Sequence, residues 1–101
     1  MQAKGGYVYI LSNKYRNVLY IGVTSNIRNR IYQHKFEKGS YFTHKYNTKD
    51  LMFYRFFDSI EEAIKFEKQL KFWKRVWKFE LIKKENLEMV DLAADWFNEV
   101  Y

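Results

Sequence analysis

Cysteine and proline are both absent from this chain of 101 residues, and glycine occurs only four times. The lack of cysteine excludes a disulfide framework, a Cys-type zinc site and a thiol nucleophile, and it is the usage expected in a reducing cytoplasm. The sequence also has no signal-peptide pattern and no apolar run near the roughly 18 residues of a membrane-spanning helix. We therefore expect a cytoplasmic protein that does not enter a membrane.

Aromatic residues, in contrast, are abundant at 21% of the chain, and hydrophobic residues as a whole make up 48%. This content predicts a compact folded chain in which tyrosine and phenylalanine build much of the core. The length suits one domain with a modest core, and no repeat, linker or low-complexity tract divides it. We expect residues 1–101 to form a single domain.

Positive charge is concentrated in the first part of the chain. The net charge is +6, with ten Lys or Arg against three Asp or Glu in residues 1–60, whereas residues 88–101 carry four acidic side chains and no basic one. A basic surface fits a polyanionic partner such as nucleic acid. A mildly basic solvated surface is about as common when charge is the only observation, so charge alone does not decide between the two.

Two segments rich in β-branched and aromatic residues predict a β-hairpin near the N-terminus. Strands are expected over about residues 6–12 and 18–23, because the polar stretch between them has the composition of a turn. Tyr9 and Tyr20 then stand on neighbouring strands and can face each other. Taken alone, such tyrosines are most often half-buried core residues.

The first predicted helix follows the hairpin directly. Ser25 or Asn26 is expected as its N-cap, and Gly39 ends it after about residue 37. Arg30 and His34 are four residues apart, which places them on one face of this helix, one turn from each other. Each would be read alone as a surface or packing residue, but a hairpin followed at once by this pair is typical of an active site.

The second predicted helix carries a carboxylate in an unusual place. It starts at Ser59, which has the spacing of a capping box with Glu62, and it runs to about Leu70. On the helical wheel Glu67 falls inside the apolar stripe of this helix. A buried, unpaired carboxylate is strongly unfavourable, so Glu67 must be paired, coordinate a cation or line a cleft. A lone glutamate at a stripe edge is most often part of a structural salt bridge.

The other segments complete an α+β fold, a small, mostly antiparallel three-stranded sheet flanked by helices. A third strand is expected over residues 51–57, and residues 38–50 are expected to form a basic, aromatic loop. A further helix, after a bend, holds Trp73, Trp77 and Leu81. Residues 87–100 are expected to form a C-terminal amphipathic acidic helix. Its expected apolar face consists of Met89, Ala93, Trp96 and Val100.

Taken together, these residues carry a family resemblance. In order and spacing, Tyr7-Val8-Tyr9, Tyr20-Ile21-Gly22, Arg30, His34 and Glu67 resemble the GIY-YIG nuclease domain over nearly the whole chain. The resemblance is closest to the small single-domain branch of uncharacterised endonucleases. The segments that match this branch are 22–25, 31–35, 42–46 and 67–71. The first triplet departs from Gly-Ile-Tyr but keeps its tyrosine, and Leu87 stands where the branch often has proline.

The resemblance implies divalent-metal-dependent hydrolysis of a phosphodiester in nucleic acid, with DNA favoured over RNA. Tyr9 would activate or orient the attacking water, and Tyr20 would position water and phosphate. Arg30 would neutralise charge that grows in the transition state, and His34 would relay a proton or bind phosphate. Glu67 would hold Mg²⁺ or Mn²⁺ with the help of waters and a substrate phosphate.

Five further residues are candidate substrate contacts by the same resemblance: Gly22, His44, Lys45, Tyr46 and Asn86. Gly22 also has a structural interpretation, because the strand can end close to the cleft without a Cβ. Asn86 would equally serve as the N-cap of the final helix. The aromatic residues of the basic loop either stack on unpaired bases or pin the loop.

Two alternatives to an independent nuclease stay open from the sequence. The first is a GIY-YIG domain that binds nucleic acid without cutting it, or that cuts only with a protein partner. A less supported alternative is a protein-interaction module that acts through the acidic final segment. The terminal aromatic stripe packs either on its own sheet or on a second subunit, as in a homodimer.

Overall fold

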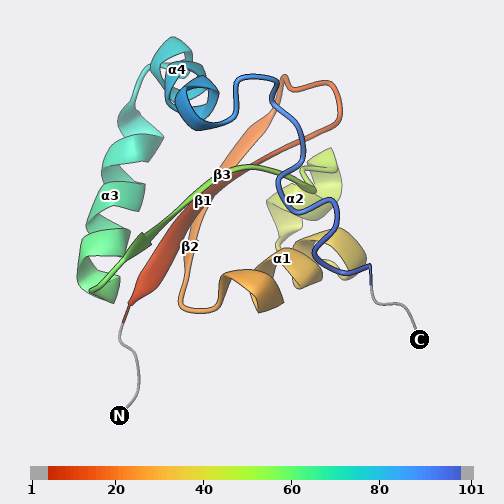
Figure 1. Cartoon of the computed structure of the whole chain (residues 1–101), viewed down its shortest axis with the longest axis horizontal. Helices are drawn as coiled ribbons and strands as arrows, with labels where there is room; N and C mark the ends of the chain where they lie inside the picture. Colours follow the sequence, from red (N-terminus) through yellow and green to blue (C-terminus); the bar gives the residue numbers. More distant parts are fainter. Residues whose placement is uncertain (1–4, 99–101) are drawn as a thin grey trace.

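The sheet has three antiparallel strands in the order β2-β1-β3, as the computed structural model shows for residues 5–98, the part of the chain it describes (Figure 1). β1 spans Gly6–Ser12, β2 spans Leu19–Thr24 and β3 spans Asp50–Phe57. Both pairings of the central strand β1 are antiparallel. The expected hairpin, third strand and α+β fold class are therefore confirmed.

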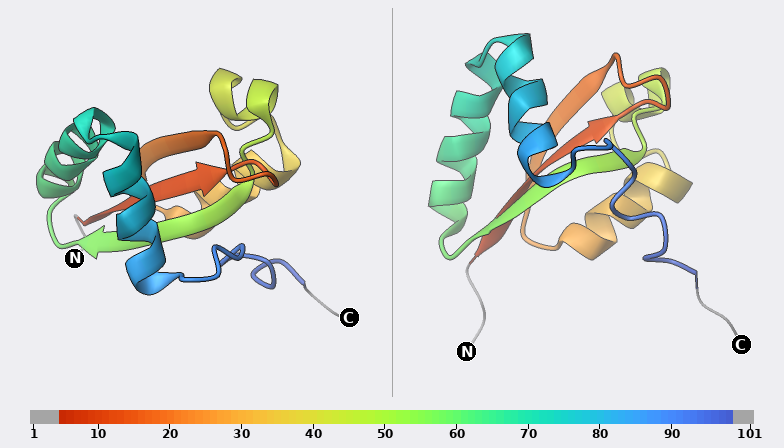
Figure 2. Two further views of the ribbon diagram at one scale, coloured as in Figure 1. Left: turned by 90° about the horizontal axis from the view of Figure 1, so that it is seen from above. Right: turned by 45° about the horizontal axis from the view of Figure 1, so that its top comes forward.

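Side chains of β1 alternate between two cores, one on each face of the sheet. Val8 and Ile10 belong to the core that α3 (Ile60–Phe72) and α4 (Arg75–Glu85) cover. Tyr9 and Leu11 belong to the other core, which contains Ile31 of α1 (Ile27–Phe36). Figure 2 shows α1 and α3 on different sides of the strands. The sheet thus positions Tyr9 between β2 and α1.

Helix starts follow their expected capping signals. The Asn26 side chain accepts a hydrogen bond from the Asn29 N–H at the start of α1. The Ser59 side chain accepts one from the Glu62 N–H at the start of α3. The expected bend after α3 falls at Trp73 and Lys74, whose extended backbone separates α3 from α4. Trp73 therefore caps α3 and does not lie inside the following helix.

The prediction of a loop over residues 38–50 was wrong in part, because α2 (Tyr41–Tyr46) lies within this range. Ser40 and Thr43 form a reciprocal capping box at its start, and Asn47 ends it in the left-handed conformation at φ 54°. Caps stabilise this single helical segment. Six residues are too few to show a hydrophobic period, so the prediction missed it.

The expected C-terminal helix is also corrected. Residues 87–98 form turns without a helix, and residues 99 and 100, including Val100 of the expected stripe, lie outside the described residues. The Asp91 carboxylate accepts hydrogen bonds from the N–H groups of Leu51 and Ala93, and the Leu92 N–H donates to the Leu51 carbonyl. These bonds fasten the segment to β3, and they use backbone groups that a helix would need for itself.

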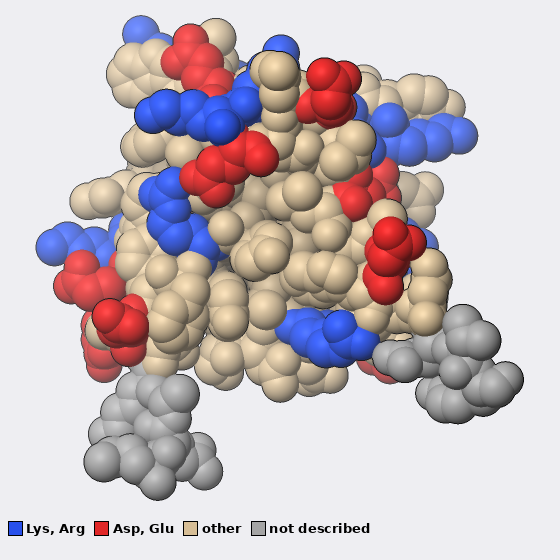
Figure 3. Space-filling model, in the orientation of Figure 1, with Lys and Arg blue, Asp and Glu red and all other residues tan. Residues whose placement is uncertain are grey.

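Charged side chains of both signs are interspersed over the face of the molecule that Figure 3 shows. That view therefore contains no large surface of one sign. Among the helices of residues 5–98, none is long and apolar enough to cross a membrane.

Candidate active site

The central contact of the site joins β1 to α1. The Tyr9 hydroxyl oxygen lies 2.9 Å from Nε2 of His34, and both side chains are only 1% exposed. The ring of Tyr20 lies beside both, with centroid distances of 6.3 Å to Tyr9 and 5.6 Å to His34. The hairpin and the first helix therefore bring these three predicted residues together.

Gly22 is required by the position of the Tyr9 ring. The two residues are partners in the β1–β2 register, so their side-chain positions share a face of the sheet. A Cβ at Gly22 would lie 2.5 Å from both the Cζ and the hydroxyl oxygen of Tyr9, which is closer than atoms in contact come. The ring thus crosses the space that any other residue at position 22 would fill, and this supports the structural interpretation of Gly22.

A second hydrogen bond fixes the His34 ring from its other side. Nδ1 of His34 lies 2.9 Å from Oγ1 of Thr43, and both side chains are buried. The Thr43 hydroxyl donates to the Ser40 carbonyl at 3.2 Å. We infer that Nδ1–H donates to Thr43 and that Nε2 accepts from Tyr9, because the Thr43 proton is already used.

Thr43 was missed among the predicted site residues. Its signal was present in the sequence, because Ser40 and Thr43 have the i, i+3 spacing of a capping box. The turn before it is closely packed as well. A Cβ at Gly39, whose φ is +62°, would lie 2.4 Å from Nδ1 of His34. Glycine at this position admits both the left-handed turn and the histidine ring.

Burial keeps both members of the Tyr9–His34 pair neutral. Burial raises the pKa of Tyr9 to about 12, with a smaller contribution from Tyr20, while Arg30 opposes the rise. Burial, and next the charge of Arg30, lower the pKa of His34 to about 4. Arg30 thus favours the Tyr9 phenolate, but the effect of burial is larger. At neutral pH the tyrosine holds its proton and the histidine is uncharged, with the Nε2 lone pair facing the Tyr9 hydroxyl.

Arg30 and Glu67 lie near enough to this pair for their charges to act on it. Both shift the pKa of Tyr9, Arg30 downward and Glu67 upward. Nη1 of Arg30 donates to Oε1 of Gln33 at 2.6 Å. Glu67, on α3, is only 7% exposed. Tyr9, Tyr20 and His34 are thus in contact, and the charges of the other two residues predicted as catalytic, Arg30 and Glu67, act on Tyr9.

Glu67 is paired, as its position in an apolar stripe required. Its Oε2 lies 2.6 Å from Nζ of Lys71, one turn further along α3. Among residues 5–98 no group of three or more His, Cys, Asp or Glu is arranged to hold a metal ion. One carboxylate still suits Mg²⁺, which keeps most of its waters and completes its shell with substrate phosphate. The donor set fits such an ion if Glu67 is shared with, or released by, Lys71.

The remaining predicted contacts divide into two places. His44, Lys45 and Tyr46 are exposed on α2, and Nζ of Lys45 lies 5.3 Å from the centre of the Tyr46 ring. Asn86 is buried and ends α4, so it is not the N-cap of a final helix. Its amide nitrogen donates to the carbonyls of Met52 and Val90. These bonds give Asn86 a structural role, and its contact with substrate stays a prediction.

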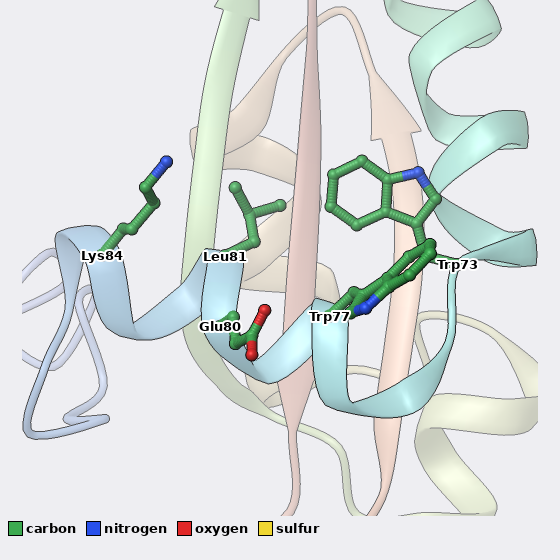
Figure 4. A pocket seen from close by; sticks show the side chains of 5 residues that line it. All are labelled: Trp73, Trp77, Glu80, Leu81 and Lys84. Atoms are coloured by element: carbon green, nitrogen blue, oxygen red, sulfur yellow. The ribbon is translucent and has the colours of Figure 1, made fainter.

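The cavity of about 390 Å³ beside α4 does not belong to this site. It lies where α3 meets α4, with Trp73 and Trp77 next to each other (Figure 4). None of its lining residues is among those predicted to act on a substrate. They are Trp73, Trp77, Glu80, Leu81 and Lys84.

The chain matches one family model and is similar to a protein of known structure. A family model described as the GIY-YIG catalytic domain matches residues 5–84. The chain is also similar to a UPF0213 protein from Bacillus halodurans, whose structure was solved by solution NMR. The two share 32% sequence identity, the match covers 81% of this chain and 86% of that one, and the TM-score is 0.53. No curated protein matches the chain at a significant level.

Proposed function

The chain belongs to the GIY-YIG family, a nuclease-type family, and from this membership we propose that it is an endonuclease that hydrolyses phosphodiester bonds in nucleic acid, with DNA as the favoured substrate. One observation supports the proposal above the others. The neutral Tyr9–His34 pair is hydrogen-bonded at 2.9 Å beside Arg30 and Glu67. A buried acid–base pair next to a cation and a carboxylate has the parts that phosphodiester hydrolysis requires.

In the proposed reaction the Tyr9 oxygen takes a proton from the attacking water while its own proton passes to His34. The water oxygen bonds to phosphorus, and the bond from phosphorus to the leaving sugar oxygen breaks. A tyrosine with a raised pKa is a weak acid, so it cannot give up its proton to bulk solvent at neutral pH. Nε2 of His34 is within hydrogen-bond reach of this proton. Because its pKa of about 4 makes the imidazole a weak base, the transfer has to be concerted with the attack of water on the phosphate. Thr43 holds the ring in the tautomer that leaves Nε2 free to accept the proton.

Charge on the phosphate is stabilised by Arg30. Its guanidinium is permanently charged and offers two parallel N–H donors to phosphate oxygens. Tyr20 is half-buried, so it is the tyrosine that a substrate can reach directly, and it positions the water and the phosphate. Both contributions grow as negative charge develops in the transition state.

A divalent cation, Mg²⁺ or Mn²⁺, would be held by Glu67 and would polarise the phosphoryl oxygen and the leaving group. Lys71 now pairs with this carboxylate at 2.6 Å. Because the two cations compete for the same oxygen, we expect cation binding to weaken the Glu67–Lys71 pair. The chemistry of the donor set thus favours a weakly held ion that arrives with substrate.

The second candidate is a GIY-YIG domain that binds nucleic acid without cutting it, or that cuts only when a protein partner positions it. It is favoured by the 1% exposure of Tyr9, which leaves little of the ring open to an attacking water. Movement of nearby side chains, driven by substrate or by a partner, would then be needed before reaction.

The experiment that separates these candidates is incubation with branched, duplex and single-stranded DNA and RNA, in Mg²⁺, in Mn²⁺ and in chelator. Arg30→Ala serves as the variant, because Arg30 is half-buried on a helix surface and its loss leaves both cores intact. The proposal expects metal-dependent cleavage that Arg30→Ala loses. If the protein binds the substrates but cleaves none of them, the endonuclease proposal is wrong and the second candidate is supported.

A further inference from the structure

A row of aromatic rings leads away from the candidate active site. The ring centres of Tyr20 and Phe42 are 5.6 Å apart, and those of Phe42 and Tyr46 are 4.7 Å apart. Tyr20 belongs to the site, whereas Phe42 and Tyr46 lie on α2 and are 37% and 43% exposed. The rings therefore connect the catalytic side chains with the protein surface.

The row ends at an open cavity of about 370 Å³. Tyr46 lines it from α2, and Tyr15 lines it from the turn between β1 and β2. The two elements lie side by side at the same end of the sheet (Figures 1 and 2). Tyr15 is 73% exposed, so its ring contributes little to any core. We call Tyr20, Phe42, Tyr46 and Tyr15 the aromatic path.

Lysines accompany the exposed rings of the aromatic path. Nζ of Lys14 lies 5.1 Å from the centre of the Tyr15 ring, and Nζ of Lys45 lies 5.3 Å from that of Tyr46. Lys49 also lines the cavity. The acidic side chain in the lining, Asp50, is paired with Arg16 at 2.6 Å, so its charge is compensated. The cavity therefore presents flat rings together with positive charge.

We propose that the aromatic path binds an unpaired strand of DNA and guides it to the candidate active site. The proposal rests on the proposed function and defines its substrate class, which is DNA with a single-stranded segment next to the bond that is cut. Exposed rings stack on bases of any sequence, and ammonium groups beside them neutralise phosphates. In a closed duplex the bases are already stacked on each other, so the rings would have nothing to bind.

Binding is measured by fluorescence anisotropy in chelator, so that the result does not depend on cleavage. The probes are a labelled single-stranded DNA of about 15 nucleotides, long enough for several stacking contacts, the blunt duplex of the same sequence and the matching RNA strand. Tyr46→Ala and Tyr15→Ala are compared with Tyr46→Phe and Tyr15→Phe, which keep the ring. Phe72→Ala controls for loss of any exposed ring, because Phe72 is 91% exposed and lies outside the path.

The proposal expects single-stranded DNA to bind more tightly than the duplex. Each alanine variant should then weaken binding of the single strand on the order of tenfold, while the phenylalanine variants and Phe72→Ala bind like the parent. Equal losses on duplex and single strand, or parental affinity in both alanine variants, would overturn it. Tighter binding of RNA than of DNA would overturn the assignment to DNA. A chain that binds as expected but cleaves nothing would refute the proposed function and leave the aromatic path standing.

Discussion

The Tyr9 hydroxyl and Nε2 of His34 are 2.9 Å apart inside a site where neither side chain is more than 1% exposed. β1 supplies one partner and α1 the other, so the contact depends on how the first helix packs against the sheet. Burial raises the pKa of Tyr9 and lowers that of His34. The pair is therefore neutral at neutral pH, and in the tautomer inferred from the contact with Thr43 the phenol donates and the imidazole accepts.

The two residues should act as one unit in catalysis. We expect Tyr9→Phe and His34→Gln each to lower kcat by about 10²- to 10⁴-fold, because each removes one end of the proton transfer. The double variant should be little slower than either single variant, since groups that act together give non-additive losses. Single-turnover cleavage rates measure this, and multiplied losses in the double variant would show that the residues act separately.

Gly22→Ala should destabilise the fold and disturb the site together. The new Cβ would lie 2.5 Å from the Tyr9 ring, so the ring must move away from His34. We expect a loss of about 1–3 kcal/mol in the free energy of unfolding, as for other overpacked sites. In a Tyr9→Ala background the ring that the Cβ would meet is absent. Gly22→Ala should then change the free energy of unfolding in urea very little. An equal loss in both backgrounds would rule out this clash as the cause.

Stability should fall in mildly acidic solution because of His34. Its pKa is about 4 in the folded chain, below the ordinary 6.5 of an unfolded one. Between pH 6.5 and pH 4 the His34 imidazole is protonated in the unfolded chain but stays neutral in the folded chain. The contribution of His34 is complete above about pH 6.5 and is lost as the pH falls to about 4, a change on the order of 3 kcal/mol.

Urea unfolding across this pH range tests the linkage, with His34→Gln as the control. The glutamine does not titrate, so the free energy of unfolding of the variant should change less between pH 7 and pH 4 than that of the parent. Identical pH dependence in the two proteins would mean that His34 titrates normally in the folded chain.

Thr43 should act as a positioning residue for His34. Thr43→Val keeps the shape of the side chain but removes the acceptor of Nδ1–H, leaving a buried polar group without its partner. We expect a loss of about 1–3 kcal/mol in stability together with slower cleavage, and Thr43→Ser should restore both. Nitrogen chemical shifts of the His34 ring report the tautomer. An unchanged tautomer in Thr43→Val would remove the positioning role.

Much of this arrangement could be predicted from the sequence, and the misses have physical causes. The two-residue period of β1 and β2 placed Tyr9 and Tyr20 on one face, and the four-residue spacing of Arg30 and His34 placed them on one side of α1. Such periods predict which side chains share a face, because each strand and helix buries one of its faces. Thr43 escaped notice because a cap on a six-residue helix has no period.

The segment after α4 shows where periodicity misleads. Ala93 and Trp96 have helical spacing, yet they pack in the Tyr9 core from a chain of turns. The hydrogen bonds between this segment and the backbone of β3 are tertiary contacts, which no local sequence pattern predicts.

Glu67 was predicted only in part. Its place in an apolar stripe predicted a partner, but only the structure identifies that partner as Lys71.

The most direct test of the account is cleavage of DNA by the parent, Glu67→Gln and Glu62→Gln in a titration with Mg²⁺. Glu62 is an exposed carboxylate on the same helix and serves as the matched control. The account predicts metal-dependent cleavage by the parent and by Glu62→Gln, and loss of that cleavage in Glu67→Gln although the variant folds and binds DNA. Equal cleavage by all three proteins, or cleavage that persists in chelator, would contradict it.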